Sequence, residues 1–141
     1  MEILRINGTD RRLYDVLAPL VMNPAVLRQN NNYPFKTTPR HVWFVALKDG
    51  QVEGFMPVKP AGGRYYVDNY YIRGDRDETF DLLLGRITAD GDFGGELTAL
   101  VHKRHSEAFL RNRFNTYLEF KNYDKMDYDM RRGHGQAAEH V

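Results

Sequence analysis

The sequence contains no cysteine. Disulfide bonds, thiolate zinc sites and a cysteine nucleophile are therefore excluded, and the absence suits a reducing compartment. The sequence also lacks an apolar run near the ~20 residues that a membrane-spanning helix needs, and its first residues lack the apolar segment of a signal peptide. We therefore expect a soluble, cytoplasmic protein.

Net charge is also small. The chain carries 20 Lys and Arg residues against 19 Asp and Glu residues, which offers no electrostatic case for binding nucleic acid or an anionic membrane. With 141 residues, 42% hydrophobic and 28% charged, it has the length and composition of one globular domain. We expect this domain to span residues 1–130. Residues 131–141 contain glycine and almost no large apolar side chain, which predicts a mobile C-terminal tail.

The clearest pattern lies in residues 41–87. Residues 42–47 form a continuous apolar run, which is typical of a strand buried on both faces. Asp49 and Gly50 follow this run. They are a strong signal for a tight hairpin turn, because a type I′ turn needs positive φ at both of its central positions.

Two further strands are predicted after this turn. The first, residues 52–58, contains Gly54, a candidate bulge, and Pro57, which a strand tolerates only near its end or at a sheet edge. The second, residues 64–72, is rich in tyrosine and favours a strand. Strict alternation would place Tyr65, Val67, Asn69 and Tyr71 on one face and Tyr66, Asp68, Tyr70 and Ile72 on the other.

Periodicity and capping signals predict the flanking elements. Pro19 should end or kink a helix over residues 13–21. Asn23 followed by Pro24 predicts the start of a second, short helix, and Ser106 predicts the cap of a later one. The remaining predicted elements are strands at 2–7, 97–101, 115–120 and 126–130, helices at 77–89 and 107–113, and a polar loop at 29–40.

The order of these elements resembles that of the GNAT superfamily of N-acetyltransferases. Residues 44–55 are similar to the family's central hairpin, residues 67–72 to its fourth strand, and residues 105–114 to its late helical segment. The resemblance covers residues 1–130. It implies an α+β fold with a mixed, mostly antiparallel central sheet of about six to seven strands flanked by about four helices.

The resemblance also implies acetyl-CoA as the cofactor. Its pantetheine arm would lie in a gap beside the fourth strand and pair with the backbone of Tyr71 and Ile72. Its pyrophosphate would lie at the start of the next helix, where free N–H groups bind anions. The cofactor-binding residues implied in this way are Tyr71, Ile72, Arg73, Gly74, Arg76, Thr79 and Phe109.

The sequence departs from the family pattern at two places. Asp77 or Glu78 stands where the first motif glycine belongs, and a carboxylate ~4 Å from a pyrophosphate charge costs on the order of 1–4 kcal/mol at a surface-like dielectric. Arg73 and Arg76 would compensate by binding phosphate directly. Phe109 stands where GNAT enzymes often carry the tyrosine that protonates the leaving thiolate, although water or another residue can serve.

Acyl transfer to an amine benefits from a nearby base. His102 and His105 bracket the end of the strand beside which the thioester would lie. Either is a candidate base or cofactor contact, with a solvated strand-end histidine as the alternative. Asp68 is another candidate base, with a paired structural aspartate as the alternative. The two histidines also have a metal-like spacing, but no third ligand is evident, so we expect no metal.

Two main function hypotheses stay open. The first is an acetyl-CoA-dependent N-acyltransferase that transfers an acyl group directly to a small-molecule or protein amine. The second is a non-catalytic GNAT-fold protein that binds a protein partner through its Tyr-rich strands, for example as a component of a larger assembly such as a virus particle. A third is a CoA-dependent sensor without turnover. The order of motifs favours the first hypothesis, and the acidic loop at 75–78 and Phe109 favour the second.

Overall fold

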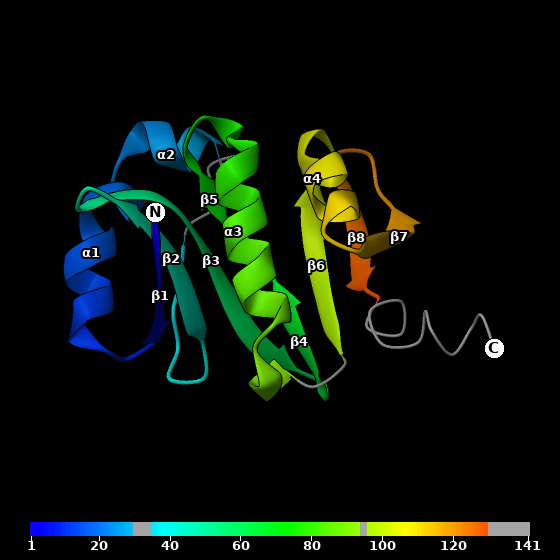
Figure 1. Ribbon diagram of the computed structural model, residues 1–141, viewed down its shortest axis with the longest axis horizontal. Helices are drawn as coiled ribbons and strands as arrows, with labels where there is room; N and C mark the ends of the chain where they lie inside the picture. Colours follow the sequence, from blue (N-terminus) through cyan, green and yellow to red (C-terminus); the bar gives the residue numbers. More distant parts are fainter. Residues whose placement is uncertain (30–34, 94–95, 130–141) are drawn as a thin grey trace.

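The computed structural model describes residues 1–29, 35–93 and 96–129, which form one sheet flanked by helices (Figure 1). The strands are β1 (Glu2–Asn7), β2 (Val42–Lys48), β3 (Gln51–Ala61), β4 (Arg64–Val67), β5 (Tyr71–Ile72), β6 (Leu97–His102), β7 (Phe114–Glu119) and β8 (Tyr123–Tyr128). The helices are α1 (Arg11–Val21), α2 (Pro24–Gln29), α3 (Asp77–Thr88) and α4 (Ser106–Arg111), with short 3-10 turns η1 (Arg73–Asp75), η2 (Gly91–Phe93) and η3 (Lys103–His105).

The sheet has the strand order β1-β2-β3-β4-β6-β8-β7, and β5 pairs with β3 outside this order. The pairing of β4 with β6 is parallel, and the other pairings of the described strands are antiparallel. The predicted α+β fold with a mixed, mostly antiparallel sheet and four helices is therefore confirmed. None of the helices in the described ranges combines the length and apolar character that crossing a membrane would require.

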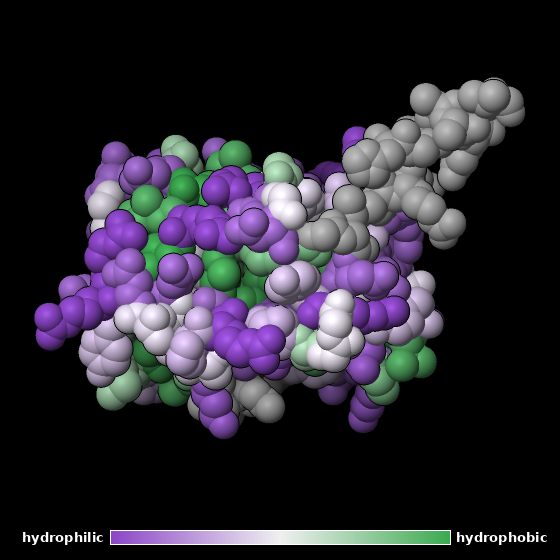
Figure 2. Space-filling model, turned by 90° about the horizontal axis from the view of Figure 1, so that it is seen from below, coloured by the Kyte–Doolittle hydropathy of each residue, from purple (hydrophilic) through white to green (hydrophobic). Residues whose placement is uncertain are grey.

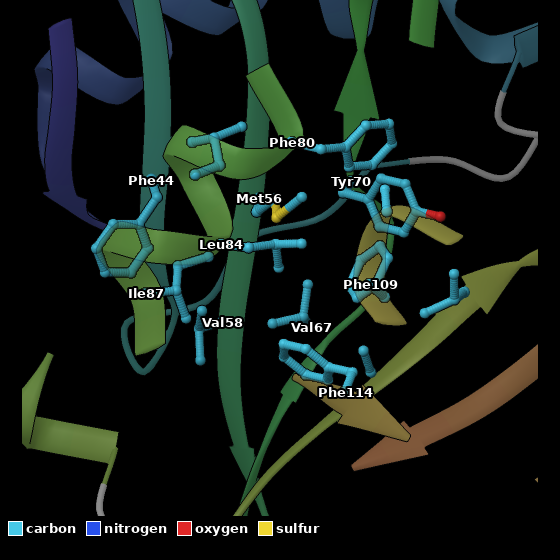
Figure 3. Close-up of a cluster of buried hydrophobic side chains, with 14 of the residues drawn as sticks. Phe44, Met56, Val58, Val67, Tyr70, Phe80, Leu84, Ile87, Phe109 and Phe114 are labelled. Atoms are coloured by element: carbon cyan, nitrogen blue, oxygen red, sulfur yellow. The ribbon is translucent and has the colours of Figure 1, made fainter. Parts of the chain in front are cut away.

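Two apolar layers cover the two faces of the sheet. Alternate residues of β2 divide between them: Phe44 faces the layer that contains α3 and α4, and Trp43 faces the layer that contains α1 and α2. Both side chains are buried, so the prediction that residues 42–47 are buried on both faces is confirmed. Figure 3 shows the larger layer, where Leu84 and Ile87 of α3 meet the strands and Phe109 of α4 packs beside them.

The hairpin prediction is confirmed by the backbone angles of the turn. Asp49 has φ 52° and Gly50 has φ 79°, which are the two positive values that a type I′ turn requires. The β2–β3 register shifts at Ala46 and Leu47, opposite Gly54. The bulge therefore lies next to the predicted position.

The structure corrects two expectations at the helix ends: Pro19 does not end its helix, and Ser106 is not a cap. Helix α1 continues to Val21 and contains Pro19 in its last turn, where the missing N–H removes only one hydrogen bond. Ser106 is the first residue of α4, and its Oγ donates to Asp124 Oδ2 at 2.7 Å instead of capping the helix. The cap predicted at Asn23 is present, since Asn23 Oδ1 accepts from the N–H of Ala25 at 2.9 Å.

The predicted single strand over residues 64–72 is broken, and this is the main correction to the fold. β4 pairs with β3 at Val58 and Val67, and β5 pairs with it again at Phe55 and Tyr71. Between these two pairs the chain advances three residues along β3 but four along the Tyr-rich segment. The Tyr-rich segment therefore contains one extra residue, which forms a bulge. Asn69, with φ 51°, lies in this bulge.

The extra residue exchanges the faces of every side chain that follows it. Val67 lies in the α3 layer, and so do Tyr70 and Ile72, whereas Tyr71 lies in the α1 layer. The predicted alternation is therefore wrong beyond Val67. Because Tyr70 and Tyr71 are both buried, they cannot form the exposed Tyr-rich protein interface that the sequence suggested.

Pro57 lies in the middle of β3, not at its end as predicted. It pairs with Trp43 of β2 on one side. On the other side it lies opposite the bulge, where the register shows no partner between Val58 and Phe55. A residue without an N–H is tolerated here because the ladder is already interrupted.

The C-terminal strands begin earlier than predicted. The prediction placed strands at 115–120 and 126–130, and the structure forms β7 from Phe114 and β8 from Tyr123. The predicted tail at 131–141 lies outside the described residues, as does part of the predicted loop at 29–40.

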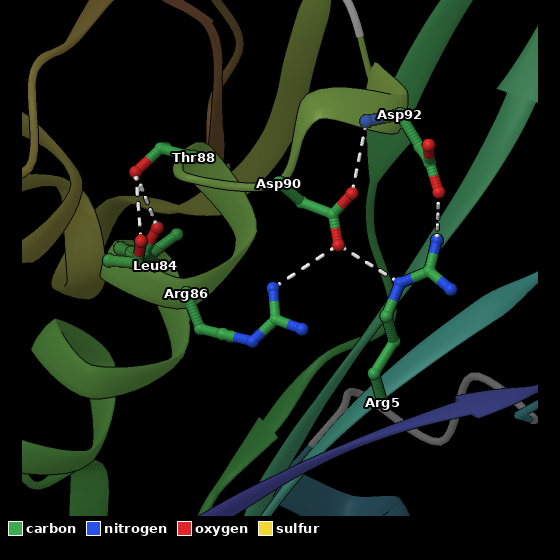
Figure 4. A network of polar contacts seen from close by, with 7 residues as sticks. Arg5, Leu84, Arg86, Thr88, Asp90 and Asp92 are labelled. Carbon is green, nitrogen blue, oxygen red and sulfur yellow. Dashed lines mark hydrogen bonds and ion pairs between the residues drawn. The ribbon is translucent and has the colours of Figure 1, made fainter.

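An ion-pair network fixes the C-terminal end of α3 to β1 (Figure 4). Asp90 Oδ2 is 2.9 Å from Arg5 Nε and 3.2 Å from Arg86 Nη1, and Asp92 Oδ2 is 2.7 Å from Arg5 Nη2. Burial raises the pKa of Asp90, but the Asp92 N–H and the two guanidinium groups outweigh burial and lower it. The folded state therefore favours the ionised carboxylate.

We predict that Asp90→Asn lowers the free energy of unfolding by about 1–3 kcal/mol at pH 7, because two guanidinium groups lose their charged partner. The loss should shrink as the pH falls through the lowered pKa of Asp90, where the wild-type carboxylate also becomes neutral. Urea unfolding at several pH values measures both effects. Asp92→Asn, at an exposed side chain with one partner, should cost less; an equal cost at the two positions would contradict the assignment.

Candidate functional site

The sheet opens beside the bulge. β4 pairs with β6 through Tyr65, Tyr66 and Val67, but β6 continues to His102. β5 pairs with β3, and in the described chain no strand pairing joins β5 to the end of β6. We call the space between β5 and residues 100–102 the β5–β6 gap.

The side chain of Tyr70 fills the inner end of this gap. Its hydroxyl oxygen lies 2.7 Å from His105 Nδ1 and accepts a hydrogen bond from the backbone N–H of His102 at 3.2 Å. Its ring contacts those of Phe80 and Phe109, with centroids 6.0 and 5.6 Å away. Figure 3 shows the hydroxyl directed away from the core, past Phe109.

A third member, Asp75, fixes the direction of these hydrogen bonds. Its Oδ1 lies 2.8 Å from His105 Nε2. An ionised carboxylate only accepts, so Nε2 carries the proton, Nδ1 of the neutral ring accepts, and the Tyr70 hydroxyl donates to it. Each polar group in the chain from the His102 N–H to Asp75 therefore has a partner, and the network specifies one histidine tautomer.

The pKa values in this cluster favour the same protonation states. Burial lowers the pKa of His105, although the Asp75 carboxylate acts to raise it. Burial and the positive charge of Arg104 lower the pKa of His102 to about 4. Burial raises the pKa of Asp75, but hydrogen bonds and charge from His105 and Arg104 lower it further than burial raises it. Burial raises the pKa of Tyr70. At neutral pH both histidines and the phenol are uncharged, and Asp75 is ionised.

Gln29 and Arg104 close the outer end of the gap. Gln29 Nε2 donates to the carbonyl oxygen of Ile72 at 2.9 Å and to Asp75 Oδ1 at 3.3 Å. Arg104 donates to Asp75 Oδ2 at 3.1 Å and to the carbonyl oxygen of Gln29 at 3.2 Å. The cavity that remains among these residues measures ≈ 10 Å³, about the space for one water molecule.

The start of α3, which follows Asp75 in the chain, is uncapped. No side chain caps its first turn, so N–H groups there are free to bind an anion. Arg76 is exposed at the N-cap, and no carboxylate of the described residues lies within ion-pair distance of it. Arg73 is partly engaged, with Nε 3.8 Å from Oε2 of Glu53, a buried oxygen that has no hydrogen-bond partner within the described ranges.

The acidic loop that the sequence raised as an obstacle is paired across the gap. Asp75 bonds to Arg104, as described, and Asp77 Oδ1 lies 3.5 Å from Arg111 Nη2. Arg111 also holds Asp81 at 2.7 Å. These cations come from the β6–α4 segment, so Asp75 and Asp77 have partners there. Glu78 is exposed and has no ion pair within the described residues.

The remaining predicted site residues occupy structural positions. Thr79 and Phe109 are fully buried. Gly74 has φ 62°, which its turn requires, although a Cβ there would meet nothing nearer than 3.8 Å. Asp68 lies apart from the histidines and pairs with Lys59 at 3.1 Å; its role as a base stays a prediction.

A larger hollow, ≈ 540 Å³, lies against α1 and contains none of the predicted site residues. Figure 2 shows hydrophobic side chains reaching the underside of the molecule on the side where α1 lies. Leu13, Leu17, Phe35 and Trp43 are among its lining residues. It shares no residue with the lining of the β5–β6 gap, whereas another open hollow, ≈ 680 Å³, contains His102 and Arg104.

Comparisons with known proteins rest on structure alone, since no family model and no curated protein sequence matches the chain. ElaA from Escherichia coli superposes with a TM-score of 0.70 at 10% identity, covering 92% of this chain and 100% of its own. An acyl-CoA N-acyltransferase from Pseudomonas aeruginosa superposes with a TM-score of 0.68 at 14% identity, and the match covers 92% of this chain and 100% of that protein. The N-acetyltransferase PseH from Campylobacter jejuni, solved with acetyl coenzyme A, superposes with a TM-score of 0.59 at 14% identity. The match covers 92% of this chain and 99% of PseH.

The chain has the GNAT fold. The resemblance stated from the sequence is thereby confirmed at the level of fold, over nearly the whole chain. The resemblance to GNAT proteins predicted the pantetheine arm in the β5–β6 gap and the pyrophosphate at the start of α3. The residues at the start of α3 fit a pyrophosphate group. Those in the gap do not leave room for a pantetheine arm unless Gln29 and Asp75 move.

The structure brings the rings of His102 and His105 within 5.6 Å of each other, and their roles stay a prediction. Sequence reasoning missed Tyr70 as their partner and also missed Gln29 and Arg104, which bond to Asp75. Tyr70 was assigned by alternation, which the bulge invalidates. Gln29 and Arg104 carry no local pattern that marks them, because they meet only through the tertiary fold. The sequence places Asp75 in the acidic loop at 75–78, and its contact with His105 has no signal in the sequence.

We predict that Tyr70→Phe lowers the free energy of unfolding by about 1–3 kcal/mol, because the His102 N–H and His105 Nδ1 lose a buried partner. Urea unfolding of the variant and the wild type measures the change. Tyr117→Phe, at a half-exposed side chain, is the matched control and should change stability little. A cost at Tyr70 no larger than that at Tyr117 would rule out the network.

We predict that His102 stays neutral from pH 8 down to about pH 5, because its pKa lies near 4. The unfolded chain takes up a proton near pH 6.5, so this histidine should make the protein lose stability as the pH falls from about 6.5 to 4. NMR titration of its ring resonances measures the pKa directly. A midpoint at 6 or above would refute the assigned burial.

Proposed function

We propose that the protein is an acyl-CoA-dependent N-acyltransferase. The observation that carries the proposal is the break between β5 and β6 beside the uncapped N-terminus of α3. Two features of this arrangement suit an acyl-CoA: an anion site for its phosphates and a strand backbone that leads away from that site. Solved proteins of the same fold include an acyl-CoA N-acyltransferase and a complex with acetyl coenzyme A.

The chain's own residues would act as follows. The free N–H groups of α3 and the exposed Arg76 would hold the pyrophosphate. The backbone of Tyr71 and Ile72 would align the pantetheine arm. The bound thioester would supply the activated acyl group, and an amine with an unprotonated nitrogen would attack its carbonyl carbon directly. The new C–N bond would replace the C–S bond, the CoA thiolate would leave, and the proton lost by the amine would reach that thiolate through water. His102, neutral at physiological pH, would accept the amine proton only weakly because its pKa is near 4.

A second candidate is a GNAT-fold protein without catalysis. The specific observation in its favour is the filled gap, where Tyr70, Gln29 and Arg104 leave a cavity of ≈ 10 Å³. Phe109, fully buried, also offers no hydroxyl at the position that the resemblance assigns to a proton donor. Binding of the cofactor discriminates between the two candidates.

Calorimetric titration with acetyl-CoA is the primary test, and we predict a dissociation constant in the micromolar range. Arg76→Glu should weaken binding about tenfold or more, because it reverses the charge beside the phosphates. Arg40→Glu, at an exposed arginine outside the site, is the matched control and should leave affinity unchanged. An amine panel followed by mass spectrometry then identifies the acylated product. Absence of binding at millimolar acetyl-CoA would leave the non-catalytic candidate.

A further inference from the structure

Four side chains bridge the β5–β6 gap from its two sides, and we call them the clasp: Gln29, Asp75, Arg104 and His105. Gln29 comes from the end of α2 and Asp75 from the loop before α3. Arg104 and His105 come from the turn between β6 and α4. The clasp therefore joins segments that the strand break leaves unpaired.

Gln29 occupies the backbone position that a ligand amide would use. Its carboxamide N–H donates to the Ile72 carbonyl at 2.9 Å, so β5 already has an amide donor on a carbonyl beside the gap. An extended ligand with amide groups, such as a pantetheine arm, would compete for this same oxygen. Binding along β5 therefore requires Gln29 to leave.

Asp75 holds the clasp closed. It accepts from His105 at 2.8 Å, from Arg104 at 3.1 Å and from Gln29 at 3.3 Å. Two of these donors lie on the opposite side of the gap, so the carboxylate spans it. Asp75 has φ 50°, a conformation uncommon for a residue other than glycine, which aims the side chain across the gap at some conformational cost.

We propose that the clasp is an intramolecular competitor of the acyl-CoA pantetheine arm, so that the ligand binds only molecules in which Gln29 has released the Ile72 carbonyl and Asp75 has released Arg104 and His105. This inference rests on the proposed function. The measured dissociation constant is then the intrinsic one divided by the fraction of molecules with an open clasp. Removing a clasp side chain raises that fraction and tightens binding without adding any contact to the ligand.

The test compares two variants, each with a matched control. Asp75→Gly removes the carboxylate where φ is positive, and Asp49→Gly makes the same change at φ 52° in the distant hairpin turn. Gln29→Ala removes the carboxamide without changing charge, and Gln51→Ala does so at an exposed position. Dissociation constants are measured by calorimetry for CoA and for pantetheine, which lacks the phosphates. Circular dichroism checks that every variant is folded.

We expect Asp75→Gly and Gln29→Ala to bind both ligands about tenfold to a hundredfold more tightly than the wild type, and both controls to bind as the wild type does. Pantetheine is the deciding ligand. A gain for CoA alone, seen only in Asp75→Gly, would reflect the lost negative charge near the phosphates and would overturn the proposal.

Two other outcomes overturn the proposal and separate it from the proposed function. If the wild type binds CoA and both clasp variants bind no more tightly, the clasp does not compete and the acyltransferase proposal stands. If no protein binds at millimolar ligand, while faster hydrogen exchange at residues 72–76 shows that the clasp has opened in the variants, both proposals fail together.

Discussion

One extra residue between Val67 and Tyr71 determines how the rest of the site is arranged. It turns β5 away from β6 and exchanges the faces of the side chains that follow, so Tyr70 enters the α3 layer and reaches the gap. Pro57 lies opposite on β3, where it has no N–H to offer a continuous neighbour. The bulge and the proline are mutually consistent: each makes the other less costly, and together they favour an interrupted ladder over a regular one.

The interruption leaves backbone groups that need partners, and side chains supply them. The His102 N–H, which a regular neighbour would have bonded, donates to the Tyr70 hydroxyl, and the Ile72 carbonyl accepts from Gln29. Buried polar groups without partners destabilise a fold by about 1–3 kcal/mol each, so a protein that keeps this gap must fill it in one way or another. In this chain the occupants are its own residues. That makes self-occupation and ligand binding alternatives that use the same hydrogen-bonding groups.

The sequence predicts the helices, strands and turns well, but it predicts the bulge and the contacts between distant loops poorly. The apolar run before Asp49, the turn itself and the helix over Phe80 and Leu84 rest on local patterns, and the structure confirms them. The bulge at Asn69 has no comparable pattern, because one inserted residue is decided by pairing with a distant strand. The contacts of Asp75 are missing from the sequence analysis for the same reason. They depend on two loops, about thirty residues apart, meeting across the gap.

The position of the charges also changes how the acidic loop should be interpreted. Compared with a family motif, Asp77 or Glu78 in the acidic loop looks like an electrostatic barrier to a pyrophosphate. In the structure Arg104 pairs with Asp75 and Arg111 with Asp77, which lowers the like-charge cost of these two carboxylates but not that of Glu78. A ligand would therefore meet less repulsion than the sequence suggests, but it would have to separate ion pairs that tie α3 to α4. In the proposed mode of acyl-CoA binding, the release of side chains matters more than the sign of the loop's charge.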